Sequence, residues 1–151
     1  EGTLGWVREC LQRTGVPGSA VTFELDETEA TEHLKAAKRL MDGLQALGCK
    51  LALEHFGKGP NSFNLLKHLP ADILKIDGSY IHHLASNRDN QAMVRSITDM
   101  AQSMEKDTIA EFVEDANSLS VLWQCGIKYI QGYFLQAPDQ MLAFDFANEG
   151  I

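Results

Sequence analysis

The sequence predicts an α/β fold in which parallel strands alternate with helices, and three observations support this. Short apolar runs are separated by segments with helical periodicity, which is typical of buried parallel strands in a repeating βα array. Several of these runs end in an acid, an amide or a Lys-Asp pair, and functional residues gather at the carboxyl ends of such strands. The chain has 151 residues, 44% of them hydrophobic and 23% charged, which suits one globular domain.

The first third of the chain predicts two helices and two strands. A helix over 2–14 ends in a segment rich in Gly and Pro, and a strand follows over 20–25. A long helix is predicted over 29–47, because leucines recur there at helical spacing and a glycine follows. The second strand, over 50–54, leads into the loop FGKGPNS.

The rest of the chain continues the alternation, with strands predicted over 72–76, 108–112 and 127–131 and helices over 63–68, 78–84, 88–105, 116–124 and 139–147. This gives about five parallel strands, whereas a closed eight-stranded barrel needs about 250 residues. We therefore expect the chain to cover roughly the C-terminal five βα units of a barrel. An open doubly wound sheet is the alternative, but no Gly-rich phosphate turn follows any strand.

Composition excludes several classes of function. The net charge of −8 argues against binding to a nucleic acid polymer or an anionic membrane surface. The three cysteines have no CxxC spacing, which indicates free thiols in a reducing cytoplasm. No apolar stretch approaches the roughly 20 residues of a membrane span, so we expect no membrane insertion. The chain begins with Glu1 rather than Met, which indicates part of a longer protein.

Acidic side chains mark the ends of successive predicted strands. The residues concerned are Glu24, Glu27, Glu54, Asp77, Glu111 and Glu114, with Gln131 after the last strand. Carboxylates that converge at one edge repel one another and lose hydration. Such a ring therefore predicts a site that holds a divalent cation or carries out proton chemistry.

Four segments in register resemble one known family. The runs ELDE, EHFGKGPNSFNLLKHLPADILKID, AEFVED and QGYFLQAP are similar to the motifs of the EAL domain of cyclic-di-GMP signalling proteins, and the similarity is closest to the FimX-like regulators of type IV pilus assembly. The resemblance implies a TIM-like (β/α)8 barrel with cyclic-di-GMP lying across the carboxyl ends of its strands. It also implies that residues 1–151 form the C-terminal portion of a single EAL-like domain, with the EAL tripeptide and the strands around it N-terminal to Glu1.

The resemblance assigns roles residue by residue. Active members use two Mg²⁺ or Mn²⁺ ions with hard oxygen ligands, and the matching positions here, should any metal bind, are Glu24, Glu54, Asp77 and Glu111. The residues expected to bind cyclic-di-GMP are Glu24, Asp77, Glu111, Phe112, Gln131 and Pro138. Lys75 and Glu54 match catalytic positions as degenerate remnants, and Glu27 matches the carboxylate that anchors the loop after the second strand.

That loop departs from the family pattern, in which DDFGTGYSS stands where this chain has EHFGKGPNS. Glu54 keeps a carboxylate but reaches one methylene further, and a misplacement on the order of 1 Å can cost about a hundredfold in rate. His55 puts an imidazole in place of a hard oxygen donor, which Mg²⁺ tolerates poorly. Lys58 adds positive charge, and Pro60 stiffens the loop. Together these changes point away from a two-metal hydrolase.

Phe112 stands where active members usually carry Gly. Its ring is expected either to stack on a guanine base or to fill the core. Side chains alternate along a strand, so if Glu111 faces the cleft, Phe112 is expected to point away from it, which favours core filling over stacking.

Three hypotheses for the function follow. The first is a catalytically inactive receptor that binds cyclic-di-GMP without a required cofactor and relays the signal to protein partners, among them a PilZ-domain adaptor in the regulation of twitching motility. The second is an active Mg²⁺- or Mn²⁺-dependent phosphodiesterase that produces pGpG. The third is a scaffold that binds no nucleotide. In each, the strands missing from the barrel come from upstream residues or from a second chain.

Overall fold

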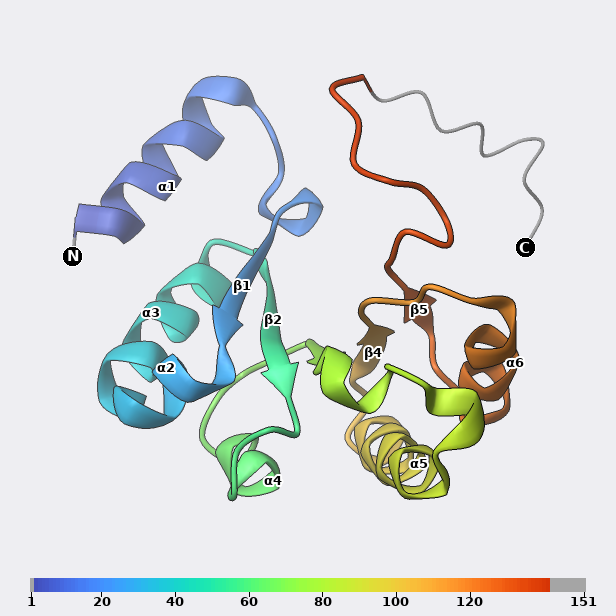
Figure 1. The fold of residues 1–151 in the computed structure, drawn as a ribbon. Coiled ribbons are helices and arrows are strands. Elements are labelled where there is room, and N and C mark those ends of the chain that lie inside the picture. The colour runs from blue at the N-terminus through green and yellow to red at the C-terminus, as the bar shows by residue number, and fades with distance from the viewer. Residues whose placement is uncertain (1, 142–151) are drawn as a thin grey trace.

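A computed structural model describes residues 2–141 and contains, within that range, a five-stranded parallel sheet with helices packed against it (Figure 1). The strands are β1 (Thr22–Asp26), β2 (Lys50–Phe56), β3 (Ile73–Ile76), β4 (Asp107–Ala110) and β5 (Tyr129–Ile130). The α-helices are α1 (Gly2–Thr14), α2 (Glu27–Glu32), α3 (Leu34–Ala46), α4 (Ser62–Leu65), α5 (Arg88–Ser103) and α6 (Ala116–Gln124). Three short 3₁₀ turns, η1 (Gly18–Ala20), η2 (Gly78–Tyr80) and η3 (Leu84–Ser86), occur in the connections.

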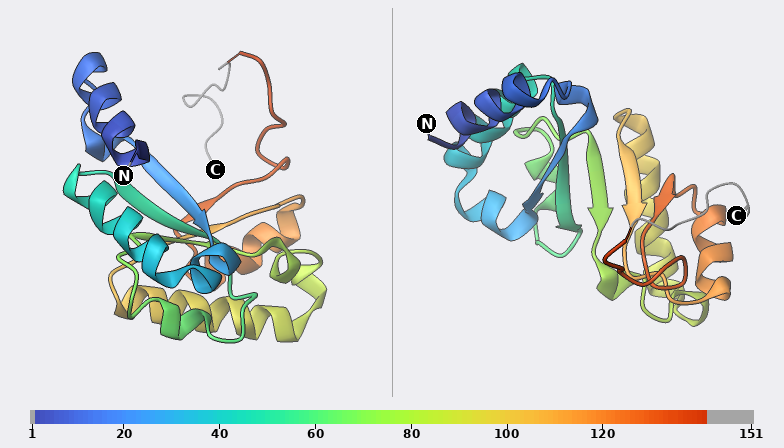
Figure 2. Two further views of the ribbon diagram at one scale, coloured as in Figure 1. Left: turned by 90° about the vertical axis from the view of Figure 1, so that its left-hand side faces the viewer. Right: turned by 90° about the horizontal axis from the view of Figure 1, so that it is seen from above.

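The strand order distinguishes the two predicted architectures. The strands lie side by side in chain order from β1 to β5, and each pairs in parallel with the next (Figure 2). A doubly wound sheet reverses direction at a switch point, whereas a barrel winds in one direction only. The prediction of a TIM-like barrel arrangement is therefore confirmed for the part of the domain that the chain covers. Within residues 2–141, β1 and β5 each have one strand neighbour.

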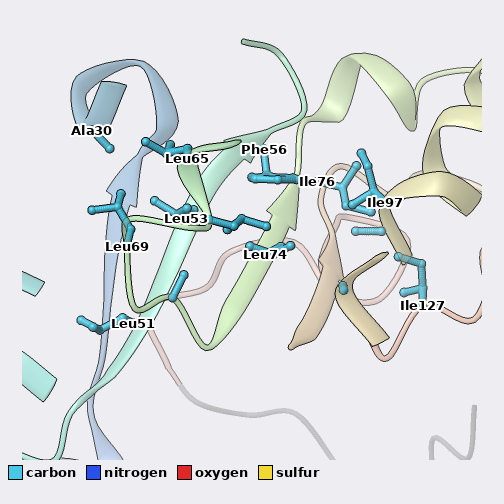
Figure 3. Packing of buried hydrophobic residues seen from close by; sticks show 14 of the residues in the cluster. Ala30, Leu51, Leu53, Phe56, Leu65, Leu69, Leu74, Ile76, Ile97 and Ile127 are labelled. Atoms are coloured by element: carbon cyan, nitrogen blue, oxygen red, sulfur yellow. The ribbon is translucent and has the colours of Figure 1, made fainter. Parts of the chain in front are cut away.

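The main core lies between the sheet and its helices (Figure 3). Leu53 of β2, Leu74 and Ile76 of β3 and Ile97 of α5 belong to this cluster, and all four side chains have no exposed surface. Burial of a side chain of this size contributes about 1.5–3 kcal/mol each. Because strand side chains alternate, the residues between them face the opposite side of the sheet, and Lys75 is one of these.

The long helix predicted over 29–47 is in fact two helices, α2 and α3. The helix is interrupted at His33, whose φ of −119° and ψ of 39° are not helical. Asp26 caps α2, because its Oδ1 accepts hydrogen bonds from the backbone N–H groups of Thr28 and Glu29 at 2.8 and 3.1 Å. The apolar periodicity continues through the break, so the pattern alone could not locate it.

Three other predicted elements differ from the structure. The segment 78–84 forms the turns η2 and η3 instead of a continuous helix. Strand β4 ends at Ala110, so Glu111 and Phe112 lie beyond it. The terminal helix predicted over 139–147 falls mostly outside the described residues, and 139–141 are not helical. Every helix within residues 2–141 is too short or too polar to cross a bilayer.

Candidate functional site

Lys75 lies at the centre of a cluster of carboxylates at the carboxyl ends of the strands. Its Nζ is 2.8 Å from Glu24 Oε2 and 2.8 Å from Glu54 Oε1, and it is 3.0 Å from Glu111 Oε1. Glu24 and Glu54 come from β1 and β2, and Glu111 directly follows β4. The predicted convergence of acids therefore occurs, but around an ammonium group whose side chain is only 4% exposed.

The charges in this cluster adjust to one another. Burial lowers the pKa of Lys75, but its hydrogen bonds to Glu24, Glu54 and Glu111 outweigh this and raise the pKa above its ordinary value. Burial and the hydrogen bond with Glu54 raise the pKa of Glu24, whereas the hydrogen bonds from Glu24 and Lys75 lower the pKa of Glu54. Oε2 of Glu111 is buried and has no hydrogen-bond partner among residues 2–141.

A β-bulge in β2 turns His55 toward the carboxyl ends of the strands. The pairing with β3 shifts between Leu53 and Phe56, so the bulged strand carries an extra residue, and His55 has a left-handed φ of 53°. Phe56 can then return to the core while His55 Nδ1 lies 2.8 Å from Asp26 Oδ2. The hydrogen bond with Asp26 raises the pKa of His55. Burial raises the pKa of Asp26, but the hydrogen bonds from His55 and from two backbone N–H groups outweigh this, so the pKa lies below its ordinary value.

The loop after β2 is held to the rest of the domain at several points. The Tyr80 hydroxyl donates to the carbonyl oxygen of Gly57 at 2.7 Å, and the backbone N–H of Gly59 donates to Glu27 Oε2 at 3.2 Å. Glu27 is 2% exposed, and its second carboxylate oxygen, Oε1, has no hydrogen-bond partner in the described part of the chain. Glu27 thus contacts the loop that we expect it to anchor. Lys58, also in this loop, places its Nζ 3.9 Å from Asp77 Oδ2.

Beside the lysine cluster, the residues after β4 and β5 enclose a cavity of about 850 Å³, which is within the range of small-molecule sites. The residues that line it are Glu111, Phe112, Glu114, Gln131, Gly132, Tyr133, Gln136, Ala137, Pro138, Asp139 and Met141. Gly132 permits the close approach of the two segments, because a Cβ there would overlap the backbone of Val113.

Phe112 lies on the rim of this cavity with its side chain 51% exposed, so it does not fill the core. The expectation based on strand alternation does not apply, because Phe112 lies beyond β4 and has a left-handed φ of 55°. This conformation costs a residue with a side chain about 1–2 kcal/mol. The ring lies close to Gly78, and its centroid is 6.1 Å from that of the His82 ring at an interplanar angle of 32°.

The structure divides the predicted site residues into two groups. Glu24 and Glu54 join Lys75, whereas Phe112, Gln131 and Pro138 line the cavity, and Glu111 belongs to both groups.

Asp77 stands apart from the lysine cluster. It is buried, and its Oδ1 accepts from the backbone N–H of Ser79 at 2.9 Å. Its cationic neighbour is Lys58, whose Nζ lies 3.9 Å from Asp77 Oδ2.

The carboxylates at the ends of the strands do not form a set of metal ligands. Within residues 2–141, no group of three or more His, Cys, Asp or Glu side chains is arranged to hold a metal ion. Glu24, Glu54 and Glu111 share the ammonium of Lys75, and a divalent cation among them would meet that positive charge at close range. The arrangement described here therefore does not fit a pair of divalent cations.

Sequence reasoning missed several residues of the site. Asp26 was not expected to pair with His55, although the two lie at the ends of adjacent strands, and strand register could have indicated it. Tyr133 lies within the loop QGYFLQAP, and its 71% exposure marks it as a surface aromatic at the cavity. Gly78 gave no signal, because its role depends on a ring from another segment.

Comparison with known proteins identifies the family. The family model described as EAL domain matches residues 1–138. The FimX EAL domain of Pseudomonas aeruginosa, solved with c-di-GMP bound, is 40% identical with a TM-score of 0.92, and the match covers 97% of this chain and 60% of that chain. The manganese/cy-diGMP complex of BlrP1 from Klebsiella pneumoniae is 26% identical with a TM-score of 0.83, covering 87% of this chain and 34% of that chain.

Among curated proteins, Cyclic di-GMP phosphodiesterase PdeB from Shewanella oneidensis is 35% identical over 144 residues. That match covers 95% of this chain and 17% of PdeB, so the chain spans a small part of this relative. The match to the family over residues 1–138, together with the parallel sheet and the cluster at its carboxyl ends, shows that the chain belongs to the EAL domain family.

Proposed function

We propose that this chain is part of a catalytically inactive EAL module that binds cyclic-di-GMP and passes the signal to protein partners. The observation that carries the proposal is the pairing around Lys75 and His55. Three carboxylates at metal-ligand positions contact one ammonium, and His55 is paired with Asp26 where active relatives have a hard oxygen donor. These pairings already occupy the carboxylates and the imidazole, so we expect ligand binding that does not require a divalent ion.

The cavity supports a role in ligand binding. It offers an aromatic ring at Phe112, hydrogen-bonding amides at Gln131 and Gln136, and a carboxylate at Glu114. Aromatic rings stack on nucleobases, and the amide and carboxylate groups suit the polar edge of guanine. The relative from P. aeruginosa, which was solved with c-di-GMP, matches nearly the whole chain.

A second candidate is an active phosphodiesterase that depends on Mg²⁺ or Mn²⁺ and produces pGpG. It is favoured by the retained Glu24, Lys75 and Glu111 at one site and by the likeness to PdeB. A manganese complex is known for BlrP1, a more distant relative.

The proposal also covers the cellular role and the location of the protein. The likeness to a FimX EAL domain supports a role in type IV pilus or twitching regulation with a PilZ-domain adaptor as partner. The three free thiols, Cys10, Cys49 and Cys125, support a cytoplasmic location. The edges of β1 and β5 are where further barrel strands would pair, supplied by upstream residues or by a second chain.

Calorimetry on the full-length protein that contains these residues tests the proposal. Cyclic-di-GMP is titrated in the presence of EDTA and again with Mn²⁺, with GMP as the control nucleotide, and the products are resolved by chromatography. We expect similar affinity in both buffers and no pGpG. Efficient conversion to pGpG would establish the phosphodiesterase instead, and no heat in either buffer would indicate a scaffold that binds no nucleotide.

The proposed partner is tested separately. A purified PilZ-domain protein from the same organism is mixed with the full-length protein, with and without cyclic-di-GMP, and separated by size. Co-elution that depends on the nucleotide supports the relay, and separate elution under both conditions contradicts it.

A further inference from the structure

Gly78, the first residue of η2, lies directly against the ring of Phe112. A Cβ built on Gly78 would overlap Cδ2 of that ring and lie 3.1 Å from both its Cγ and its Cε2. Gly78 is buried, whereas Phe112 is 51% exposed and lines the cavity. The His82 ring, at a centroid distance of 6.1 Å, comes from the same segment. The segment 78–82 therefore supports the ring of Phe112, and the exposed part of the ring belongs to the rim of the cavity.

The backbone does not explain why either residue stands where it does. Gly78 is not among the residues with a positive φ, so its conformation does not call for glycine. Phe112 has a φ of 55°, a conformation that favours glycine over any residue with a side chain. Glycine thus stands where the backbone does not need it, and phenylalanine stands where glycine would be easier. The contact between the two residues accounts for both placements, because Gly78 leaves room for a ring and Phe112 supplies it.

We infer that Gly78 is a positioning residue for nucleotide binding, because its missing side chain lets Phe112 lie against the turn after β3 and present its ring to the cavity. This inference rests on the proposed function and adds a determinant of how the base platform is held. A methyl group at position 78 would overlap Cδ2 of the ring, so the ring would have to leave the position that it now holds at the cavity.

A double-mutant cycle in the full-length protein tests this pairing. The variants are Gly78→Ala, Phe112→Gly and the two combined, and the Kd for cyclic-di-GMP is measured by calorimetry. We expect Phe112→Gly to weaken binding about tenfold, the effect of losing one stacking contact. Gly78→Ala should weaken binding by a similar factor of about ten, since it displaces the same ring. The combined variant should bind no more weakly than Phe112→Gly alone.

Gly5→Ala is the matched control, because a Cβ on Gly5 in helix α1 meets no atom within 4 Å. It should leave the Kd unchanged. Additive losses in the cycle, or unchanged binding by Gly78→Ala, would overturn the inference while leaving cyclic-di-GMP binding in place. Absence of binding by the unmodified protein would instead overturn the proposed function, and the inference with it.

Folding is monitored by thermal unfolding of each variant. If Gly78→Ala alone prevents folding, the combined variant decides, because it removes the ring that the methyl group would strike. Recovery of the fold, with the Kd of Phe112→Gly, supports the inference. If the combined variant also fails to fold, position 78 is restricted by something other than Phe112, and the inference is overturned.

Discussion

Lys75 on β3 and Glu111, the residue after β4, are joined by a 3.0 Å contact between side chains that are only 4% and 9% exposed. The same ammonium reaches Glu24 and Glu54, so one cation from the chain neutralises part of the charge of three acids. Lys75 therefore links acids from the ends of three different strands.

Replacement of Lys75 by Met should destabilise the fold. The substitution leaves buried Glu111 and partly exposed Glu24 and Glu54 without their cation, and loss of one partner of a buried pair costs about 3–5 kcal/mol. Because Glu24 and Glu54 are 41% and 29% exposed, we expect a loss near the lower limit, about 3 kcal/mol. Urea unfolding at pH 7 measures it. Lys38→Met, which breaks an exposed pair with Asp42, is the control and should cost less than about 1 kcal/mol. Equal effects of the two substitutions would contradict the central role of Lys75.

The pair of His55 and Asp26 should make stability depend on pH. The pKa of His55 is raised above its ordinary 6.5, so its contribution is complete below that value and is lost as the pH rises through the folded pKa. The pKa of Asp26 is lowered from 3.8, so its contribution is present above that value and is lost as the pH falls through the folded pKa. The pair therefore contributes most between these two ordinary values.

Unfolding of the unmodified protein and of His55→Gln, followed across this range, checks the prediction. Both partners are partly exposed, so the difference should reach about 1 kcal/mol at most near pH 5. At pH 8 the difference should be smaller. A difference that grows toward pH 8 would mean that neutral His55 contributes the stability instead.

Tyr80 should limit the motion of the loop after β2. Tyr80→Phe removes the hydrogen bond to Gly57 and leaves a carbonyl without this partner, at a cost of about 0.5–1.5 kcal/mol. Amide hydrogen exchange should become faster over 57–61, while the core of α5 keeps its protection. Tyr129→Phe, at an exposed tyrosine on β5, is the matched control. Unchanged exchange in Tyr80→Phe would show that the other loop contacts suffice.

Restoration of the acidic pair should give back little catalysis. In Glu54→Asp with His55→Asp, the shorter carboxylate no longer reaches Lys75 as Glu54 does at 2.8 Å, and Asp26 loses its imidazole partner. Lys58 remains in the loop, with its ammonium 3.9 Å from Asp77. We expect pGpG formation with Mn²⁺ to be detectable at most, as measured by chromatography against the unmodified protein. Turnover at the level of an active relative would show that these two substitutions are enough for catalysis and would contradict the prediction.

Much of the fold could be predicted from the sequence, because buried parallel strands require apolar runs such as LALEHF and ADILKID. The convergence of Glu24, Glu54 and Glu111 followed from the same pattern, since the carboxyl ends of parallel strands meet at one edge. The central position of Lys75 did not follow, because the reach of a long side chain between strands leaves no mark in the periodicity.

The backbone of the site was also beyond the reach of the pattern. The bulge that turns His55 outward adds one residue to β2, and apolar spacing does not record which residue is extra. Phe112 continues an apolar run and was assigned to a strand, but the chain turns left-handed there. The break at His33 was hidden for a related reason, because helical spacing continues on both sides of it.

The left-handed backbone at positions 55 and 112 has a consequence for mutational tolerance. In a saturation library selected only for folding, surface positions usually accept most amino acids. These two should instead accept Gly and Asn and reject Val and Ile, because β-branched residues clash in this conformation. The local backbone geometry would then restrict positions 55 and 112 to a few amino acids in related sequences, whether or not those proteins bind a nucleotide.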